Sequence, residues 1–323
     1  MTIAWVLGSR GLLGSALCRV LRFKGTELFF PAESFRWNSE PDLVLQFTMA
    51  LQAFSEHLAG SRRWEIYWAA GVGTMSSSEA DLALETRALT ILLRLIESTP
   101  QLITIPGAVA FASSAGAIYA GSPDYTISEN TMPAPTTAYA REKIRQEELI
   151  RSFVQANENR TALLARLSTV YGPGQSSNKR QGLLAHIARC ILRNQPMQIY
   201  VPLDTIRDYI NADDAATSMI LALRAISDSP GALIKIIASE QPTTIAEIIS
   251  IFKRITRRAP RIVTSAGNLT SIYSRRMQFR SIAIPQIVES PKTSLLAGIA
   301  KIMAAERAAY VCGSSVPHRR GGE

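Results

Sequence analysis

Tyr139 and Lys143 are the residues of this chain whose types and spacing point most directly to chemistry. Residues four apart lie on one face of a helix, so a helix over 138–156 would aim the phenol and the ammonium at one spot. A free phenol has a pKa of about 10, and a neighbouring ammonium lowers that pKa, so Tyr139 could act as acid or base near neutral pH. The alternative is a surface helix that carries the two residues by chance.

A glycine-rich turn at 8–14 follows an apolar strand expected at 3–7 and leads into a helix expected at 12–22. Glycine has no Cβ, so a pyrophosphate can approach the backbone, and the first N–H groups of the helix carry a partial positive charge that attracts it. The pattern therefore predicts a dinucleotide site, whereas the alternative is a tight turn that needs glycine for its own geometry. The predicted cofactor-binding residues of this turn are Gly8, Arg10, Gly11, Leu12 and Gly14.

The second expected strand, 27–30, should end near the adenosine ribose of the cofactor, where NAD enzymes usually place an acidic residue. Glu33 could fill that role. Arg10 and Arg36 offer two guanidinium groups suited to a 2′-phosphate, which favours NADP over NAD. The alternative explanation for both arginines is solvent exposure in a chain of net charge +9.

Strand and helix patterns alternate through the next part of the chain, as a doubly wound parallel sheet requires. A strand is expected at 65–71 and a helix at 83–97. The charge-free stretch 102–121 contains proline, glycine and serines, so we interpret it as a buried central strand near 109–113 and not as a membrane span. The predicted fold class is therefore α/β, with a Rossmann-type sheet. The cofactor contacts expected after the 65–71 strand are Ala69, Ala70 and Gly71.

The central strand leads into a loop that begins with Ser113 and Ser114. Open α/β sheets bind their ligands at the carboxyl ends of the strands, and a serine hydroxyl there can hydrogen-bond a substrate oxygen. The alternative is that these small residues only pack a tight turn. We predict Ser114 as the catalytic hydroxyl and Ser113 as a substrate contact.

Together these motifs resemble the extended short-chain dehydrogenases/reductases, a family that modifies nucleotide sugars. The resemblance runs along almost the whole chain. It rests on the glycine loop at 8–14, the serines at 113–114, Tyr139 with Lys143, and the segments 167–175, 207–215 and 291–298.

The resemblance implies roles for several residues. The nicotinamide ring would lie beside Tyr139 and Lys143, Lys143 would also bind the cofactor ribose, and Ser114 would orient the reacting carbonyl. Tyr171 would lie on the way to the sugar nucleotide. Arg207 would meet the diphosphate of the substrate.

Two other features of the sequence bear on these roles. Arg207 has an alternative as a surface ion pair with Asp208 or Asp213, since such pairs are frequent and weak. Related dehydratases carry Asp-Glu after the loop hydroxyl, whereas this chain has alanine and glycine at 115–116, so sugar dehydration is disfavoured. The relatives also often have asparagine where this chain has Glu-Thr-Arg at 85–87.

Length and composition predict two lobes and a cleft. With 323 residues and 47% apolar content, the chain can bury a large core. We expect a cofactor domain at 1–170, to which 203–220 returns, a smaller substrate-binding lobe at 171–312, and a disordered tail at 313–323.

Other classes of protein fit the sequence less well. The three cysteines and three histidines are scattered without metal-ligand or disulfide spacing, so no metal site is predicted. The basic cluster at 253–261 lacks the interleaved aromatic residues of a base-stacking surface, so we expect no nucleic-acid partner. No export signal is visible at the N-terminus, so we expect a cytoplasmic protein that is not a membrane protein.

The predicted function is an NAD(P)-dependent oxidoreductase acting on a nucleoside-diphosphate sugar. A keto-sugar reductase using NADP is our first interpretation, and a 4-epimerase with retained NAD is the alternative that shares the same residues. A cofactor-sensing binding protein without turnover is a second alternative. The family resemblance further implies a homodimer, formed through the helices at 83–97 and 138–156.

Overall fold

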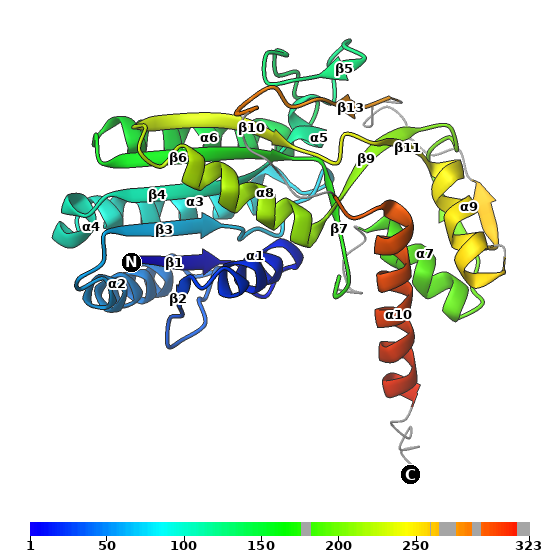
Figure 1. Cartoon of the computed structure of the whole chain (residues 1–323), viewed down its shortest axis with the longest axis horizontal. Helices are drawn as coiled ribbons and strands as arrows, with labels where there is room; N and C mark the ends of the chain where they lie inside the picture. The colour runs from blue at the N-terminus through cyan, green and yellow to red at the C-terminus, as the bar shows by residue number, and fades with distance from the viewer. Residues whose placement is uncertain (176–181, 259, 265–275, 286–291, 315–323) are drawn as a thin grey trace.

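Six strands form the central sheet in the computed structural model, which describes residues 1–175, 182–258, 260–264, 276–285 and 292–314. They pair in parallel, and the strand order changes direction at the first strand, so that the second and third lie on its two sides (Figure 1). Ligands of open α/β sheets bind at such a switch point. The strands are, in their order across the sheet, β10 (Gly231–Ile237), β6 (Arg160–Leu167), β4 (Gly107–Ser114), β3 (Arg63–Trp68), β1 (Thr2–Leu7) and β2 (Glu27–Phe29).

Helices cover both faces of this sheet, and each face has its own apolar core. One face carries α1 (Leu12–Phe23) and α8 (Ala212–Ala225). The other carries α2 (Glu40–His57), α3 (Glu79–Glu97) and α6 (Ala138–Gln155). This three-layer arrangement confirms the predicted Rossmann-type fold.

The bounds predicted from the sequence lie close to the observed bounds of these elements. Local interactions explain the differences. Helix α3 begins four residues before the predicted start because the Ser78 hydroxyl accepts the N–H of Asp81 and caps it. Strand β4 is longer than predicted and starts at Gly107, where a Cβ would overlap with the Trp64 ring. Glycine is therefore required for these two strands to pack side by side.

A smaller lobe lies beside the carboxyl end of the sheet (Figure 1). Its core contains apolar side chains of its helices and of its short strands. Its helices are α7 (Leu183–Leu192), α9 (Ile245–Thr256) and α10 (Leu295–Ser314). Its strands are β7 (Thr169–Tyr171), β9 (Ile206–Asn211) and β11 (Pro242–Thr244), which form one sheet, and β8 (Met197–Ile199) paired with β12 (Ile262–Thr264). Outside it, β5 (Thr126–Ile127) pairs with β13 (Gln278–Phe279), and α4 (Pro100–Thr104) and α5 (Ala115–Ile118) are short.

The segment that returns to the cofactor domain is longer than the predicted 203–220. Both α8 and β10 belong to that domain, because β10 pairs with β6 from Gly231 to Ile237 and buries Ile236 and Ile237. At the other end of the chain, α10 runs to Ser314, two residues into the expected tail. The remaining tail residues, 315–323, lie outside the described residues.

None of the helices in the described segments combines the length and apolar character that crossing a membrane demands.

Candidate active site

The glycine loop packs against the turn that follows β3. Gly8 has φ +82, and a Cβ on it would lie 2.5 Å from the Ala69 carbonyl oxygen and 2.6 Å from the Ala70 nitrogen. A Cβ on Gly14 would lie 2.1 Å from the Gly8 carbonyl oxygen. Since contacts this short exclude any side chain, both glycines are required, and the structure brings Ala69 and Ala70 against the loop.

The N-terminus of α1 is built to receive an anion. Gly11 is the N-cap, no side chain caps the helix, and its first turn contains no acidic residue. The first N–H groups of the helix are therefore left for a ligand, and they carry partial positive charge. This cradle, too narrow for any Cβ at Gly8 or Gly14, fits the pyrophosphate of a dinucleotide.

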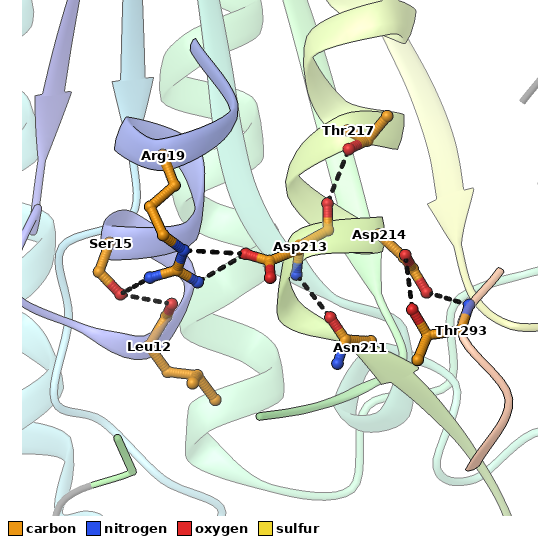
Figure 2. Close-up of polar contacts among 8 residues, drawn as sticks. All are labelled: Leu12, Ser15, Arg19, Asn211, Asp213, Asp214, Thr217 and Thr293. Atoms are coloured by element: carbon orange, nitrogen blue, oxygen red, sulfur yellow. Dashed lines mark hydrogen bonds and ion pairs between the residues drawn. The ribbon is translucent and has the colours of Figure 1, made fainter. Parts of the chain in front are cut away.

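Hydrogen bonds join α1 to the start of α8, and α8 to the segment before α10, and hold α1 in place (Figure 2). Arg19 donates from Nη2 and Nε to Oδ1 of Asp213 at the start of α8, at 2.5 and 3.2 Å. The next residue, Asp214, accepts the N–H and the hydroxyl of Thr293 at 2.6 and 3.1 Å. Figure 2 shows Asn211 capping α8 at the Asp213 N–H. The glycine loop is thereby tied to the segment that precedes α10.

The two arginines predicted to recognise a 2′-phosphate are both exposed. Arg36 follows β2 and has 73% of its side chain exposed, with Nη1 3.3 Å from Oδ2 of Asp42. Its backbone N–H donates to Gln46. An exposed pair of this kind contributes little, about 0–1 kcal/mol, so it would not prevent Arg36 from meeting a phosphate. Arg10 lies in the glycine loop itself.

Tyr139, Lys143 and Ser114 come together, as predicted, at the carboxyl edge of the sheet. The two helical residues share one face of α6, whose start is capped by Thr137, and Lys143 Nζ lies 5.7 Å from the centroid of the Tyr139 ring. Ser114, at the end of β4, hydrogen-bonds the Tyr139 side chain. Lys143 is only 5% exposed, so the alternative of a solvated surface helix does not describe this face of α6.

The electrostatics of the pair differ from the expectation that Lys143 lowers the pKa of Tyr139. Burial raises the pKa of Tyr139 most, the charge of Glu85 raises it further, and the hydrogen bond from Ser114 opposes both. Burial lowers the pKa of Lys143, opposed by nearby carboxylates, Glu85 first among them. Burial and the charge of Glu85 therefore decide the direction in which the pKa of Tyr139 moves.

A polar chain that the sequence reasoning missed orients Lys143. Nζ of Lys143 donates to Oε1 of Gln146 at 3.1 Å, and Nε2 of Gln146 donates to Oγ1 of Thr86 at 2.8 Å. Thr86 and Gln146 are both buried. The only signal in the sequence was the spacing of Gln146, three residues after Lys143 on the same helix.

Ser113 belongs to a buried polar network, which argues against its predicted role as a substrate contact. It is 4% exposed, and its hydroxyl donates to Oε1 of Glu147 at 2.6 Å. Glu147 also accepts two hydrogen bonds from Arg166, at 3.0 and 2.6 Å, and Arg166 donates to the Tyr119 hydroxyl. Side chains alternate along a strand, so Ser113 points into this buried network while Ser114 meets Tyr139.

Tyr171 likewise lies in the protein interior. It is 2% exposed within the core of the smaller lobe. A Cβ on Gly298 would overlap with its hydroxyl, which shows how tightly α10 packs against it. Burial and the charge of Asp214 raise the pKa of Tyr171 to about 12, opposed by a hydrogen bond with Asn211. The burial of Tyr171 argues against the predicted substrate contact, which stays a prediction.

Arg207 lies on β9, half-buried, with Nη1 donating to the carbonyl oxygen of Ile206 at 2.7 Å. The two carboxylates considered as its partners have other contacts. Asp208 is buried and accepts hydrogen bonds from Ser239 and Gln241, and Asp213 pairs with Arg19 as described above. The role of Arg207 at a diphosphate stays a prediction.

Fold and site thus define an α/β protein with a dinucleotide cradle and a tyrosine–lysine pair beside it. The chain belongs to the NAD dependent epimerase/dehydratase family, whose model matches residues 4–236. This confirms the predicted membership of the extended short-chain dehydrogenases/reductases. The expected class, an NAD(P)-dependent enzyme of the epimerase and reductase type, is confirmed at the level of the family.

Individual relatives share part of the chain. The chain is 32% identical to dTDP-L-rhamnose 4-epimerase from Burkholderia thailandensis over 125 residues. This match covers 38% of this chain and 33% of the relative. Over 115 residues, 36% of each protein, the chain is 30% identical to dTDP-4-dehydro-6-deoxyglucose reductase from Escherichia coli. The matches thus span only 33% and 36% of the lengths of these relatives.

The fold is shared over nearly the whole chain. The solved structure of MoeE5 in complex with UDP-glucose and NAD has a TM-score of 0.74 with this chain, covers 96% of it and 100% of its own length, and is 22% identical.

Proposed function

We propose that this protein is an NAD(P)-dependent oxidoreductase that acts on a nucleoside-diphosphate sugar, as a keto-sugar reductase. The observation that carries the proposal is the meeting of Tyr139, Ser114 and the buried Lys143 at the sheet edge that also holds the glycine cradle. A bound nicotinamide would supply hydride chemistry at this place.

Tyr139 would be the proton donor of the reduction. Its phenol is protonated at neutral pH, since its pKa is raised above the ordinary value of about 10, and it would give its proton to the alkoxide that forms when a ketone is reduced. Ser114, hydrogen-bonded to that phenol, would align the substrate oxygen. Lys143 would place its positive charge next to the phenolate that remains and lower the free energy of forming that phenolate.

The residues after the catalytic serine support reduction over dehydration. Ala115, which is buried, and Gly116 follow Ser114, and neither has an ionisable side chain. Neither can supply the acid and base that removal of water from a sugar needs.

NADP is the cofactor that we propose. Arg10 and the exposed Arg36 are the side chains available for a 2′-phosphate, with the weak Arg36–Asp42 pair giving way to it. Titrating NADPH and NADH into the free protein tests this proposal, and equal affinities would remove the role given to the arginines.

The activity itself is tested with purified protein, NADPH and a 4-keto-6-deoxy nucleotide sugar. Loss of the absorbance of the reduced cofactor, in proportion to the sugar, is the result expected of a reductase. Epimerised sugar without net oxidation of cofactor would instead show a 4-epimerase, the activity named for the relative from B. thailandensis.

Tyr139→Phe separates catalysis from cofactor sensing. This variant keeps the ring and loses only the hydroxyl, so cofactor should still bind while turnover disappears. Unchanged turnover would show that another group is the acid. Cofactor binding without turnover of any nucleotide sugar by the unmodified protein would favour the sensing alternative.

We also propose a homodimer through α3 and α6. Their exposed side chains include the charged Arg87, Arg141, Arg145 and Glu148 and the apolar Leu84. Sedimentation over a range of protein concentrations should show a dimer, and a monomer at every concentration would contradict the proposal.

A further inference from the structure

Glu85, on the first half of α3, reaches the turn that follows β3. Its Oε1 accepts the backbone N–H groups of Val72 and Gly73, both at 2.5 Å. A Cβ placed on Gly71 would come within 3.0 Å of Oε2. The carboxylate therefore lies directly against the turn whose first residues, Ala69 and Ala70, support the glycine cradle.

The same carboxylate acts on the proton-transfer pair across the interface of α3 and α6. Its negative charge raises the pKa of Tyr139 and is the strongest of the charges that raise the pKa of Lys143. One side chain thus touches the cofactor side of the site and also influences both residues of its chemistry.

In the described part of the chain, no salt bridge holds Glu85, and two backbone N–H groups are its hydrogen-bond donors. The ammonium of Lys143 lies within its electrostatic reach. Glu147, another carboxylate near Lys143, differs because Arg166 holds both its oxygens. Glu85 therefore contributes a negative charge at the edge of the site that acts against the positive charge of Lys143.

We propose that Glu85 is a positioning residue that shifts the preference of this site towards the oxidised nicotinamide cofactor. The oxidised ring carries a positive charge and the reduced ring is neutral, so a nearby carboxylate favours the oxidised form, against the ammonium of Lys143. A shift in this direction makes the bound reduced cofactor a stronger hydride donor. The inference rests on the proposed function, since it requires the redox ring to lie beside Tyr139 and Lys143.

Binding measurements on Glu85→Gln test the proposal without turnover. The amide can still accept from Val72 and Gly73 but has no charge. Glu79→Gln is the matched control, because Glu79 lies on the same helix, is 82% exposed and pairs only with the exposed Arg141 at 3.6 Å in the described residues. Dissociation constants are measured by calorimetry for the oxidised and the reduced cofactor with each protein.

We expect Glu85→Gln to weaken binding of the oxidised cofactor, relative to binding of the reduced cofactor, by about threefold to tenfold. This is the size expected for the loss of one charge in a partly solvated site. Glu79→Gln should keep the ratio of the unmodified protein. An unchanged ratio in Glu85→Gln, or an equal loss of both forms, would overturn the proposal, because a purely structural anchor has no preference for ring charge.

The two proposals fail in distinguishable ways. If the unmodified protein binds neither form of the cofactor, the proposed function is wrong. If it binds both forms and Glu85→Gln leaves their ratio unchanged, the proposed function stands and the role of Glu85 is wrong.

Discussion

Neighbouring residues at the end of β4 serve different purposes, and the alternation of the strand decides which. Ser113 donates to the buried Glu147, which Arg166 also holds, while Ser114 hydrogen-bonds Tyr139. A buried carboxylate needs its donors, because each unsatisfied polar group costs about 1–3 kcal/mol. The network under the site therefore holds β4, α6 and β6 together, and the chemistry is left to the next residue.

From this difference we expect distinct outcomes for two serine-to-alanine changes. Ser114→Ala removes the hydroxyl beside Tyr139 and should lower kcat by about 100-fold. Because that hydroxyl also accepts the N–H of Ala117 as the N-cap of α5, the change should cost about 1 kcal/mol of stability as well. Ser113→Ala removes a donor to Glu147 and should lower the free energy of unfolding by about 1–2 kcal/mol, with little effect on kcat. Steady-state kinetics and urea unfolding measure the two. A larger kinetic effect for Ser113→Ala would reverse the assignment.

At the scale of elements, the cofactor cradle depends on how closely β1, α1 and the turn after β3 approach one another. Gly8 allows that approach by its positive φ and by its lack of a Cβ, and α8 fixes α1 through the Arg19–Asp213 contact. The orientation of the helix N-terminus is therefore a property of three packed elements and not of the loop alone.

Gly8→Ala and Gly25→Ala separate the two requirements. Both glycines have positive φ, +82 and +70, but a Cβ on Gly25 meets nothing within 4 Å. Gly25→Ala should therefore cost about 1 kcal/mol of stability, from the backbone conformation alone. Gly8→Ala adds the clash with Ala69 and should cost about 3 kcal/mol or more and weaken cofactor binding. Thermal unfolding and cofactor titration measure both, and equal costs would show that the close approach is unimportant.

At the scale of the whole molecule, buried and half-buried phenols are distributed over both lobes. Burial raises the pKa of each of them above the ordinary value of about 10. For Tyr171 and Tyr209, in the smaller lobe, the raised pKa is about 12. The others, in the cofactor domain, are Tyr67, Tyr119 and Tyr139.

These phenols predict a loss of stability at alkaline pH. Above about pH 10 the unfolded chain releases their protons and the folded protein keeps them, so stability, complete below pH 10, falls as pH rises towards about 12. Each such group contributes up to about 1.4 kcal/mol per pH unit. Urea unfolding from about pH 8 to about pH 11, across the ordinary phenol pKa of about 10, should show the fall. Tyr209→Phe removes one of these phenols, so the free energy of unfolding should fall less steeply with pH. An unchanged slope would contradict the role of the buried phenols.

The sequence by itself determined the fold class, the glycine cradle and the tyrosine–lysine pair. These depend on local rules: apolar runs make buried strands, glycine permits close approach after β1, and a spacing of four places Tyr139 and Lys143 on one helical face. Such signals need no knowledge of distant residues.

The tertiary structure alone decided which polar side chains face the site. Ser113 turns to Glu147, 34 residues away, Tyr171 packs under α10, and Glu85 reaches across to the pair on α6. The return of β10 to the main sheet was likewise not visible in its apolar pattern. Each of these outcomes depends on which segments pack together, and burial and charge at a site are set by that packing and not by spacing along the chain.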